Sequence, residues 1–196
     1  EEAEVCFLMD RFGYAKVLDK NTYERNKETV HGEYKYVFTC MNTDKICLFT
    51  NKGQMHTVKV MDLPLTRLRD KGVPIDNVSN YSSSDEQIVS VYDSEQMRFA
   101  MLLFSTAQGM VKKVSGSEFQ VAKRTILATK LQEEDSLVDV RVVNENKHVV
   151  LQTKNGYFLR FPATEVPIKK KAAVGVRGIR LQKKDELEKV YLFEEG

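Results

Sequence analysis

Short apolar runs alternate with glycine-containing turns along the whole chain. Four glycines, Gly13, Gly53, Gly109 and Gly156, each separate two apolar runs, and the last three directly follow Lys, Gln or Asn. This arrangement is typical of β-hairpins whose turn needs a positive φ, and the flanking residues alternate as strands do. No segment shows sustained helical periodicity. The pattern therefore predicts a chain built from β-hairpins.

The four hairpins belong to a longer repeat. Nine and ten residues after each glycine stand the pairs Thr22-Tyr23, Asp62-Leu63, Glu118-Phe119 and Glu165-Val166. Two further apolar runs follow each of the last three hairpins, and the first repeat has a shortened form of them. Serial four-stranded units of this length are typical of propellers. We predict an all-β fold, a β-pinwheel or propeller-like disc of about four four-stranded blades, with repeat units 1–44, 45–98, 99–145 and 146–196.

The composition agrees with a folded domain. Of 196 residues, 42% are apolar and 30% are charged, so the chain can bury a core. The longest apolar run, Phe99–Phe104, is too short for a membrane span, and no signal peptide opens the chain. Because the first residue is Glu1 and not Met, we interpret the chain as a single domain excised from a longer protein.

The cysteines and histidines do not predict a metal site or a catalytic site. Cys6, Cys40 and Cys47 are odd in number and irregularly spaced, which excludes a disulfide framework and fits a reducing cytoplasm. His31, His56 and His148 are far apart and have no ligand partner at metal-binding spacing. No Walker A, GxSxG, HExxH or GxGxxG motif occurs.

Charge is distributed unevenly between the two halves. Residues 1–98 carry 13 Lys and Arg against 16 Asp and Glu, whereas residues 99–196 carry 17 against 12. An acidic half joined to a basic half indicates a surface that faces a polyanion, although a solvated surface with uneven charge gives the same count.

The repeats resemble those of the C-terminal β-pinwheel domain of bacterial type II topoisomerase A subunits, the family of the gyrase A and topoisomerase IV A subunits. The similarity runs over nearly the whole chain and is strongest from 100 to 185. The segments that carry it are Gly109–Val114 with Ser117–Phe119, Ala128–Leu131 with Glu134–Val138, Thr153–Phe161, and Gly175–Leu181.

This resemblance implies that the outer rim of the disc binds and bends duplex DNA. It also implies that the domain has no catalytic centre and no cofactor of its own, because the DNA-cleaving tyrosine of the family belongs to another domain. ATP and Mg are used elsewhere in the parent enzyme. The implied partners are duplex DNA, the ATPase B subunit of the enzyme, and the remainder of the A subunit. The implied location is the nucleoid in the bacterial cytoplasm, with no membrane.

Gyrase members of the family carry a Gln-Arg-Arg-Gly-Gly-Lys-Gly box after the first hairpin. The corresponding segment here, Tyr23–Gly32, keeps one glycine and two bases, Arg25 and Lys27, beside Glu24 and Glu28. This departure favours a topoisomerase IV-like protein that supports decatenation and relaxation. The alternative is the DNA-wrapping C-terminal domain of a gyrase A subunit with a degenerate box.

Basic residues near turns and glycines are the candidates for phosphate contacts. In the basic half they are Lys112, Lys113, Lys123, Arg124, Lys130, Arg160, Lys169, Lys170, Lys171, Arg177 and Arg180. A second set lies in the acidic half: Lys16, Lys59, Arg67, Arg69 and Lys71. Each also has a structural interpretation, since lysines on exposed strands discourage edge-to-edge aggregation.

Two other classes of function stay open. A propeller scaffold for protein interactions predicts an exposed apolar or aromatic patch, and a hydrolase predicts carboxylates or histidines gathered at a central pocket. The DNA-binding hypothesis predicts basic side chains along the edge of the disc.

Overall fold

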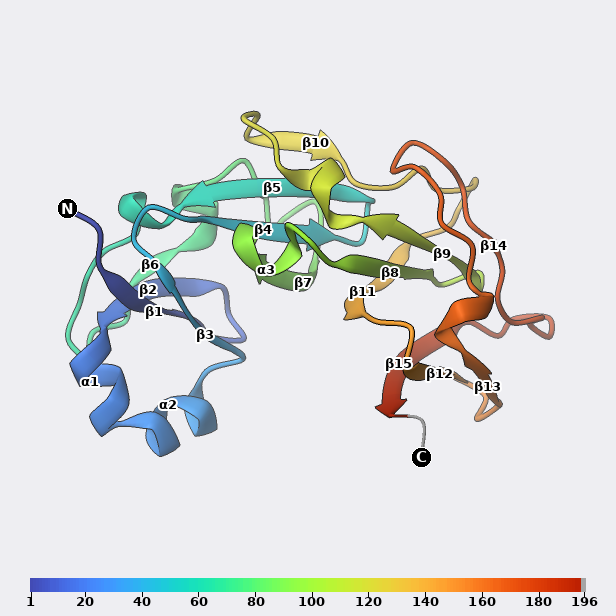
Figure 1. Ribbon diagram of the computed structural model, residues 1–196, viewed down its shortest axis with the longest axis horizontal. Helices are drawn as coiled ribbons and strands as arrows, with labels where there is room; N and C mark the ends of the chain where they lie inside the picture. Colours follow the sequence, from blue (N-terminus) through green and yellow to red (C-terminus); the bar gives the residue numbers. More distant parts are fainter. Residues whose placement is uncertain (195–196) are drawn as a thin grey trace.

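The computed structural model describes residues 1–194 and confirms the all-β prediction. Four antiparallel sheets follow one another along an arc (Figure 1). The turn glycines Gly13, Gly53, Gly109 and Gly156 all have φ between 78° and 90°, as the hairpin pattern requires.

The strand order repeats from sheet to sheet. Sheet 1 has the order β3 (Tyr36–Met41), β1 (Glu4–Met9), β2 (Tyr14–Asp19), β6 (Val73–Pro74). Sheet 2 has the order β7 (Ile88–Asp93), β4 (Lys45–Thr50), β5 (Gln54–Lys59), β10 (Thr125–Leu127). Sheet 3 has the order β11 (Leu137–Val143), β8 (Met101–Thr106), β9 (Met110–Ser115), β14 (Val176–Arg177). Sheet 4 has the order β15 (Leu187–Glu194), β12 (Lys147–Thr153), β13 (Phe158–Pro162).

Each of the first three sheets takes its outermost strand from the next repeat unit. Strand β6 belongs to the second unit, β10 to the third and β14 to the fourth. The sheets therefore cross the sequence boundaries at 44/45, 98/99 and 145/146, which ties neighbouring sheets together by main-chain hydrogen bonds. Within residues 1–194, sheet 4 has three strands and β13 is its edge.

Apolar side chains at alternate positions along the strands fill the spaces between neighbouring sheets. Val5 and Phe7 of β1 pack with Ile46 and Leu48 of β4, between sheets 1 and 2. Two further clusters lie between sheets 2 and 3 and between sheets 3 and 4. Leu63, Phe119 and Val166, the apolar residues of three predicted pairs, close these clusters at the short 3₁₀ helices η1 (Val60–Asp62), η3 (Gly116–Phe119) and η4 (Ala163–Glu165). A further 3₁₀ helix, η2 (Ile75–Asn77), follows β6.

The first repeat differs from the sequence-based expectation because it contains two helices, α1 (Lys20–Arg25) and α2 (Lys27–Glu33). Asp19 caps α1 by accepting a hydrogen bond from the Thr22 amide at 2.8 Å. Tyr23 and Val30 cover the free face of sheet 1. Six- and seven-residue helices are too short to leave a periodic signal. The four-residue helix α3 (Ser94–Met97) begins at a capping box formed by Asp93.

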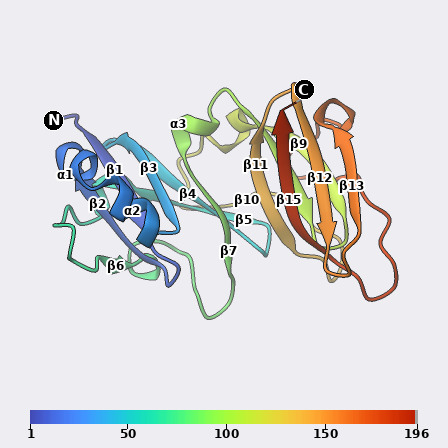
Figure 2. The same ribbon diagram turned by 90° about the horizontal axis from the view of Figure 1, so that it is seen from below.

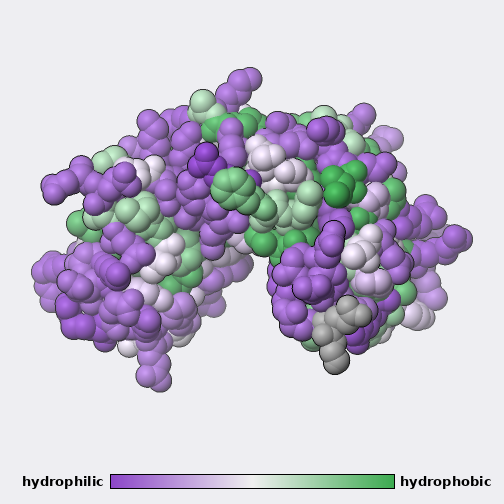
Figure 3. Space-filling model, viewed as in Figure 1, coloured by the Kyte–Doolittle hydropathy of each residue, from purple (hydrophilic) through white to green (hydrophobic). Residues whose placement is uncertain are grey.

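The outer strands lie on the convex side of the arc. Figure 1 places β10 and β14 on this side, whereas β3, β11 and β15 face the concave side. Turned by 90°, sheet 1 with α1 and α2 lies at one end of the molecule, sheet 2 lies in the middle, and the strands of sheets 3 and 4 lie at the other end (Figure 2). Figure 3 shows a hollow on the concave side between the first and the last sheets. We call the outer edge formed by β6, β10 and β14 the rim.

Candidate nucleic-acid interface

Three corresponding segments lead into the rim strands, and they carry half of the predicted basic residues. These rim segments are residues 64–72 before β6, 121–124 before β10 and 167–175 before β14. Their bases are Arg67, Arg69, Lys71, Lys123, Arg124, Lys169, Lys170 and Lys171. The fold therefore gathers on one edge charges that lie about a hundred residues apart in the sequence.

The first and third rim segments are loops attached at both ends to one strand. Leu65 forms a parallel bridge with Val17 of β2, and β6 then returns antiparallel to the start of the same strand. Ile168 bridges Lys113 of β9 in the same way before β14 returns. The close return needs a glycine in each loop, because a Cβ on Gly72 or Gly175 would lie within 2.4 Å of a carbonyl oxygen on the strand.

Most of the predicted phosphate-contact residues are exposed. On the rim segments, Arg67, Arg69, Lys71, Lys123, Arg124, Lys169 and Lys170 all face solvent. Arg177 lies in β14, and Lys130 and Arg180 follow β10 and β14. Lys59 is exposed at the end of β5, opposite Lys45, and lies outside the rim segments.

Lys16 and Lys112 do not reach the surface, which corrects their prediction as phosphate contacts. Lys16 is 0% exposed, and its Nζ donates to the carbonyl oxygens of Arg67, Leu68 and Asp70. Lys112 is 1% exposed, and its Nζ donates to those of Lys170, Lys171 and Ala173 at 2.6–3.0 Å. Each ammonium group is enclosed by a rim loop of its own sheet.

Two other predicted residues are partly withdrawn. Lys113 is 7% exposed, so the predicted phosphate contact is corrected here too, and its backbone instead pairs with Pro167 and Lys169. Lys171 is half-buried, and its Nζ donates to the carbonyl oxygen of Glu118 at 3.2 Å. These contacts hold the third rim segment against sheet 3.

A groove joins the edge of sheet 4 to the rim of sheet 3. It has a volume of about 300 Å³ and is lined by Arg160 of β13, Arg177 of β14 and Gly178 among others. The Nε of Arg160 donates to Nδ1 of His148 at 3.4 Å. Two guanidinium groups from different strands thus border one concave surface, a geometry that suits a phosphate.

Local contacts set the charge of the rim segments. Backbone hydrogen bonding from Arg67 lowers the pKa of Asp70, so this carboxylate stays ionised and lies 3.6 Å from the Arg67 Nε. The ammonium group of Lys71 lies 4.1 Å from the Tyr14 ring centroid, and Arg124 donates to the Val78 carbonyl at 3.0 Å. Only one carboxylate therefore dilutes the first segment, as the sequence indicates.

The segment at the position of the gyrase box forms α1 and α2. Glu24 pairs with Lys27 at 3.0 Å, and the Tyr23 hydroxyl hydrogen-bonds His31 at 2.9 Å. One of the two bases left in this segment is thus neutralised by its own neighbour.

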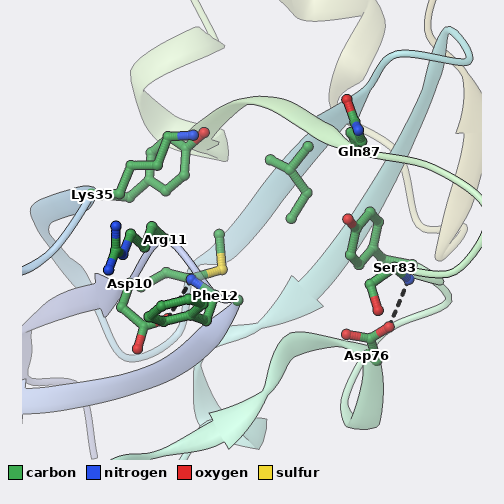
Figure 4. Close-up of a pocket in the computed structure, with 12 residues that line it drawn as sticks. Asp10, Arg11, Phe12, Lys35, Asp76, Ser83 and Gln87 are labelled. Atoms are coloured by element: carbon green, nitrogen blue, oxygen red, sulfur yellow. Dashed lines mark hydrogen bonds between the residues drawn. The ribbon is translucent and has the colours of Figure 1, made fainter.

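The other hollows on the surface are lined by both acidic and basic residues. One hollow of about 330 Å³ lies between the turn Asp10–Gly13 and the loop 81–88 (Figure 4), where Asp76 accepts a hydrogen bond from the Ser83 amide at 2.7 Å.

Across residues 1–194, no three His, Cys, Asp or Glu side chains gather as a metal site. None of the helices in that range has the length and apolar character needed to cross a bilayer.

Sequence reasoning missed a buried polar group in sheet 2. His56 stands three residues after Gly53, as Lys16 and Lys112 stand three after their glycines. Its Nε2 lies 2.7 Å from Glu86 and its Nδ1 lies 2.8 Å from Thr125 on the rim strand β10. The signal available in the sequence was this shared position.

A serial array of sheets that exchange outer strands and carry basic segments on a convex rim is a β-pinwheel domain. A family model described as the DNA gyrase C-terminal domain, beta-propeller, matches residues 44–92, 100–144 and 147–194, and the chain belongs to this family. The resemblance inferred from the repeat motifs is thereby confirmed.

Relatives and solved structures come from both branches of the family. The DNA gyrase A subunit of Lawsonia intracellularis is 31% identical over 98% of this chain and 25% of its own length. The DNA topoisomerase 4 A subunit of Bacillus subtilis is 33% identical over 93% of this chain and 23% of its own length. The chain thus spans about a quarter of these relatives.

A solved C-terminal domain of DNA topoisomerase IV superposes on the whole chain with a TM-score of 0.88 and 26% identity, covering 62% of that structure. A DNA gyrase A C-terminal domain shares the fold with a TM-score of 0.63 and 17% identity, over 95% of this chain and 64% of that one.

Proposed function

We propose that this chain is the DNA-binding C-terminal domain of a bacterial type II topoisomerase A subunit, and that its convex rim binds and bends duplex DNA. The observation that supports this proposal is the repetition of exposed bases at equivalent positions on successive sheets. Phosphates of one duplex that follows the arc would meet the first, second and third rim segments in turn. Such contacts carry no base information, so binding has little sequence preference.

The affinity arises from counterion release. Each Lys or Arg that neutralises a phosphate displaces condensed cations, so log affinity falls linearly with log salt, with a slope of about −0.9 per contact. The curvature of the rim makes contact with several segments possible only if the DNA bends. Readily deformed DNA sequences are therefore favoured without direct contacts to bases.

The test compares rim charges with charges elsewhere. Lys123→Ala, Lys170→Ala and Arg177→Ala should each weaken binding to mixed-sequence duplex and reduce the salt slope by about one. Lys20→Ala, Lys27→Ala and Lys52→Ala remove the same charge outside the rim segments and should leave the slope unchanged. Equal losses in both sets, or an affinity indifferent to salt, would reject the rim as the DNA-binding surface.

We further propose that the parent enzyme is topoisomerase IV-like and decatenates or relaxes DNA. The closer superposition on a topoisomerase IV domain and the pairing of Glu24 with Lys27 at the box position support this choice. Carboxylates beside a phosphate path repel it, so the first sheet does not extend a DNA wrap. In a plasmid assay with the reconstituted holoenzyme and ATP, the expected products are relaxed or decatenated circles. Accumulation of negative supercoils would assign the chain to gyrase.

In this proposal the domain has no catalytic centre and no cofactor of its own. An ATPase B subunit, together with the remainder of the A subunit, supplies strand cleavage and the use of ATP and Mg. The holoenzyme would act on the chromosome in the bacterial cytoplasm.

A protein-interaction role is the second candidate. The free face and edge of sheet 4 expose Phe158, Tyr191 and Phe193, at 62%, 37% and 49%. This is the kind of aromatic patch that a scaffold would use. A pull-down competed by duplex DNA would separate the two surfaces.

A further inference from the structure

The first and third rim loops share an internal feature that surface charge does not explain. Lys16 and Lys112 occupy the same place in their hairpins, three residues after Gly13 and Gly109. Each side chain extends beneath the rim loop that its own strand holds at both ends. The two loops differ in sequence, one with arginines and one with lysines, yet both enclose a buried ammonium group.

The contacts are equivalent in detail. Lys16 Nζ donates to the carbonyls of Arg67, at 3.3 Å, Leu68 and Asp70. Lys112 Nζ donates to three carbonyls in the same spacing, those of residues 170, 171 and 173. An aromatic ring lies beside each ammonium group, Tyr34 at 5.2 Å and Phe104 at 5.6 Å.

Three charge-assisted hydrogen bonds to main-chain oxygens fix the backbone of a loop. When the carbonyls turn inward to one nitrogen, the neighbouring side chains are free to turn outward, and Lys169, Lys170, Arg67 and Arg69 are indeed exposed. Without the ammonium group these carbonyls would be left without their buried donor, which costs free energy and leaves the loop to rearrange.

We propose that Lys16 and Lys112 are positioning residues for DNA binding, which preorganise the rim loops so that the surrounding bases face the phosphates. This inference rests on the proposed DNA-binding function and adds to it. A preorganised loop loses little conformational entropy on binding, so the buried lysines raise affinity without touching DNA.

The decisive comparison is Lys112→Met with Lys170→Met. The first removes a buried ammonium group and keeps the length of the side chain, whereas the second removes an exposed one from the same loop. Lys112→Met should raise the dissociation constant for mixed-sequence duplex about three- to tenfold through lost preorganisation, with the salt slope unchanged. Lys170→Met should reduce the salt slope by about one.

The pH dependence of binding gives a readout that a purely structural role would not affect. Burial lowers the pKa of Lys112 to about 8, and the charge of Glu118 opposes this shift. The other charged groups near it are Lys130 and Asp135 across a small cavity and Lys170 and Lys171 on the loop. At constant ionic strength, wild-type affinity should fall as pH rises from 7 to 9, and the Lys112→Met variant should show no such fall.

The outcomes separate the two proposals. If Lys112→Met binds DNA with the affinity and salt slope of the wild-type protein while Lys170→Met binds more weakly, the positioning role is overturned and the DNA-binding function is not affected. Absence of salt-dependent affinity in the wild-type protein would overturn the proposed function and the positioning role with it. If Lys112→Met does not fold, Lys16→Met and Arg69→Met make the same comparison in the first rim loop, and wild-type affinity in Lys16→Met would overturn the inference.

Discussion

The imidazole of His56 lies 2.7 Å from the carboxylate of Glu86, and both side chains are almost completely buried, at 3% and 5% exposure. His56 takes in sheet 2 the place that Lys16 and Lys112 take in sheets 1 and 3. Because the second rim segment is shorter, the imidazole reaches Thr125 on the rim strand itself instead of a loop. Each of the first three hairpins therefore uses the same position to hold the chain of a following repeat.

Breaking the buried pair on one side should destabilise the protein strongly. Glu86→Ala leaves the buried Nε2 of His56 without its hydrogen-bond partner, and an unsatisfied buried polar group costs about 1–3 kcal/mol. Urea denaturation of the purified chain measures the change. Glu95→Ala, which removes an exposed partner of Arg98, should change stability by no more than about 0.5 kcal/mol. Similar midpoints for the two variants would contradict the structural role given to Glu86.

Replacing two glycines by alanine, at Gly175 and at Gly32, should change stability in opposite directions. A Cβ on Gly175 would lie 2.3 Å from the carbonyl oxygen of Val111, so Gly175→Ala must push the third rim segment away from β9. Gly32 has no neighbour within 4 Å of that position and lies in α2, so Gly32→Ala should stabilise by up to about 1 kcal/mol. Thermal unfolding should show a lower Tm for the first variant and an equal or higher Tm for the second. An unchanged Tm for Gly175→Ala would mean that the close approach is absent.

The repeat could be predicted from the sequence because hairpin turns are local. A glycine with positive φ between alternating runs, as at Gly156, determines its own strands. The exchange of outer strands could not be predicted in this way, since Val73–Pro74 and Val176–Arg177 are two residues long and pair with strands of the preceding repeat. Pairing at that range depends on the packing of whole sheets and leaves no local pattern.

The exposed bases of the candidate site could be predicted because they lie in local polar segments, whereas the buried lysines could not. Clusters such as Lys169–Lys171 lie in polar loops, and loops are exposed. Lys112 lies in a strand, where alternation gives a face but does not say what covers it. The carbonyls that enclose its ammonium group lie some sixty residues away, so local charge counting assigned a structural lysine to the DNA surface.

Asp139 should make stability depend on pH. Burial in β11 raises its pKa from 3.8 to about 7, with Arg141 opposing the shift. Between about pH 4 and 7 the folded protein holds a proton that the unfolded chain releases, so stability falls as pH rises through this range. Asp139→Asn should weaken this dependence and raise the free energy of unfolding at pH 7.5 by roughly 1–3 kcal/mol. Asp93, whose pKa burial also raises to about 7, keeps part of the slope.

Urea midpoints measured at pH 4.5, 6 and 7.5 test this prediction. Asp85→Asn, at an exposed position, is the control and should follow the wild-type curve. A wild-type stability that rises between pH 4.5 and 7.5, or an Asp139→Asn variant with the wild-type slope, would contradict it.

The order of the rim segments along the arc predicts how affinity depends on the length of the DNA. The second segment, with Lys123 and Arg124, lies between the first and the third (Figure 1). A duplex too short to span the rim meets only neighbouring segments, and each added contact strengthens binding until the whole rim is covered.

The double variant Lys169→Ala, Lys170→Ala removes bases from a terminal segment. The duplex length at which affinity stops rising should therefore be shorter for this variant than for the wild-type protein. Lys123→Ala with Arg124→Ala should instead weaken binding at every length that reaches the middle of the arc and leave that limiting length unchanged. Fluorescence anisotropy with duplexes of graded length measures both quantities, and a limiting length shifted equally by the two double variants would show that DNA does not follow the rim in this order.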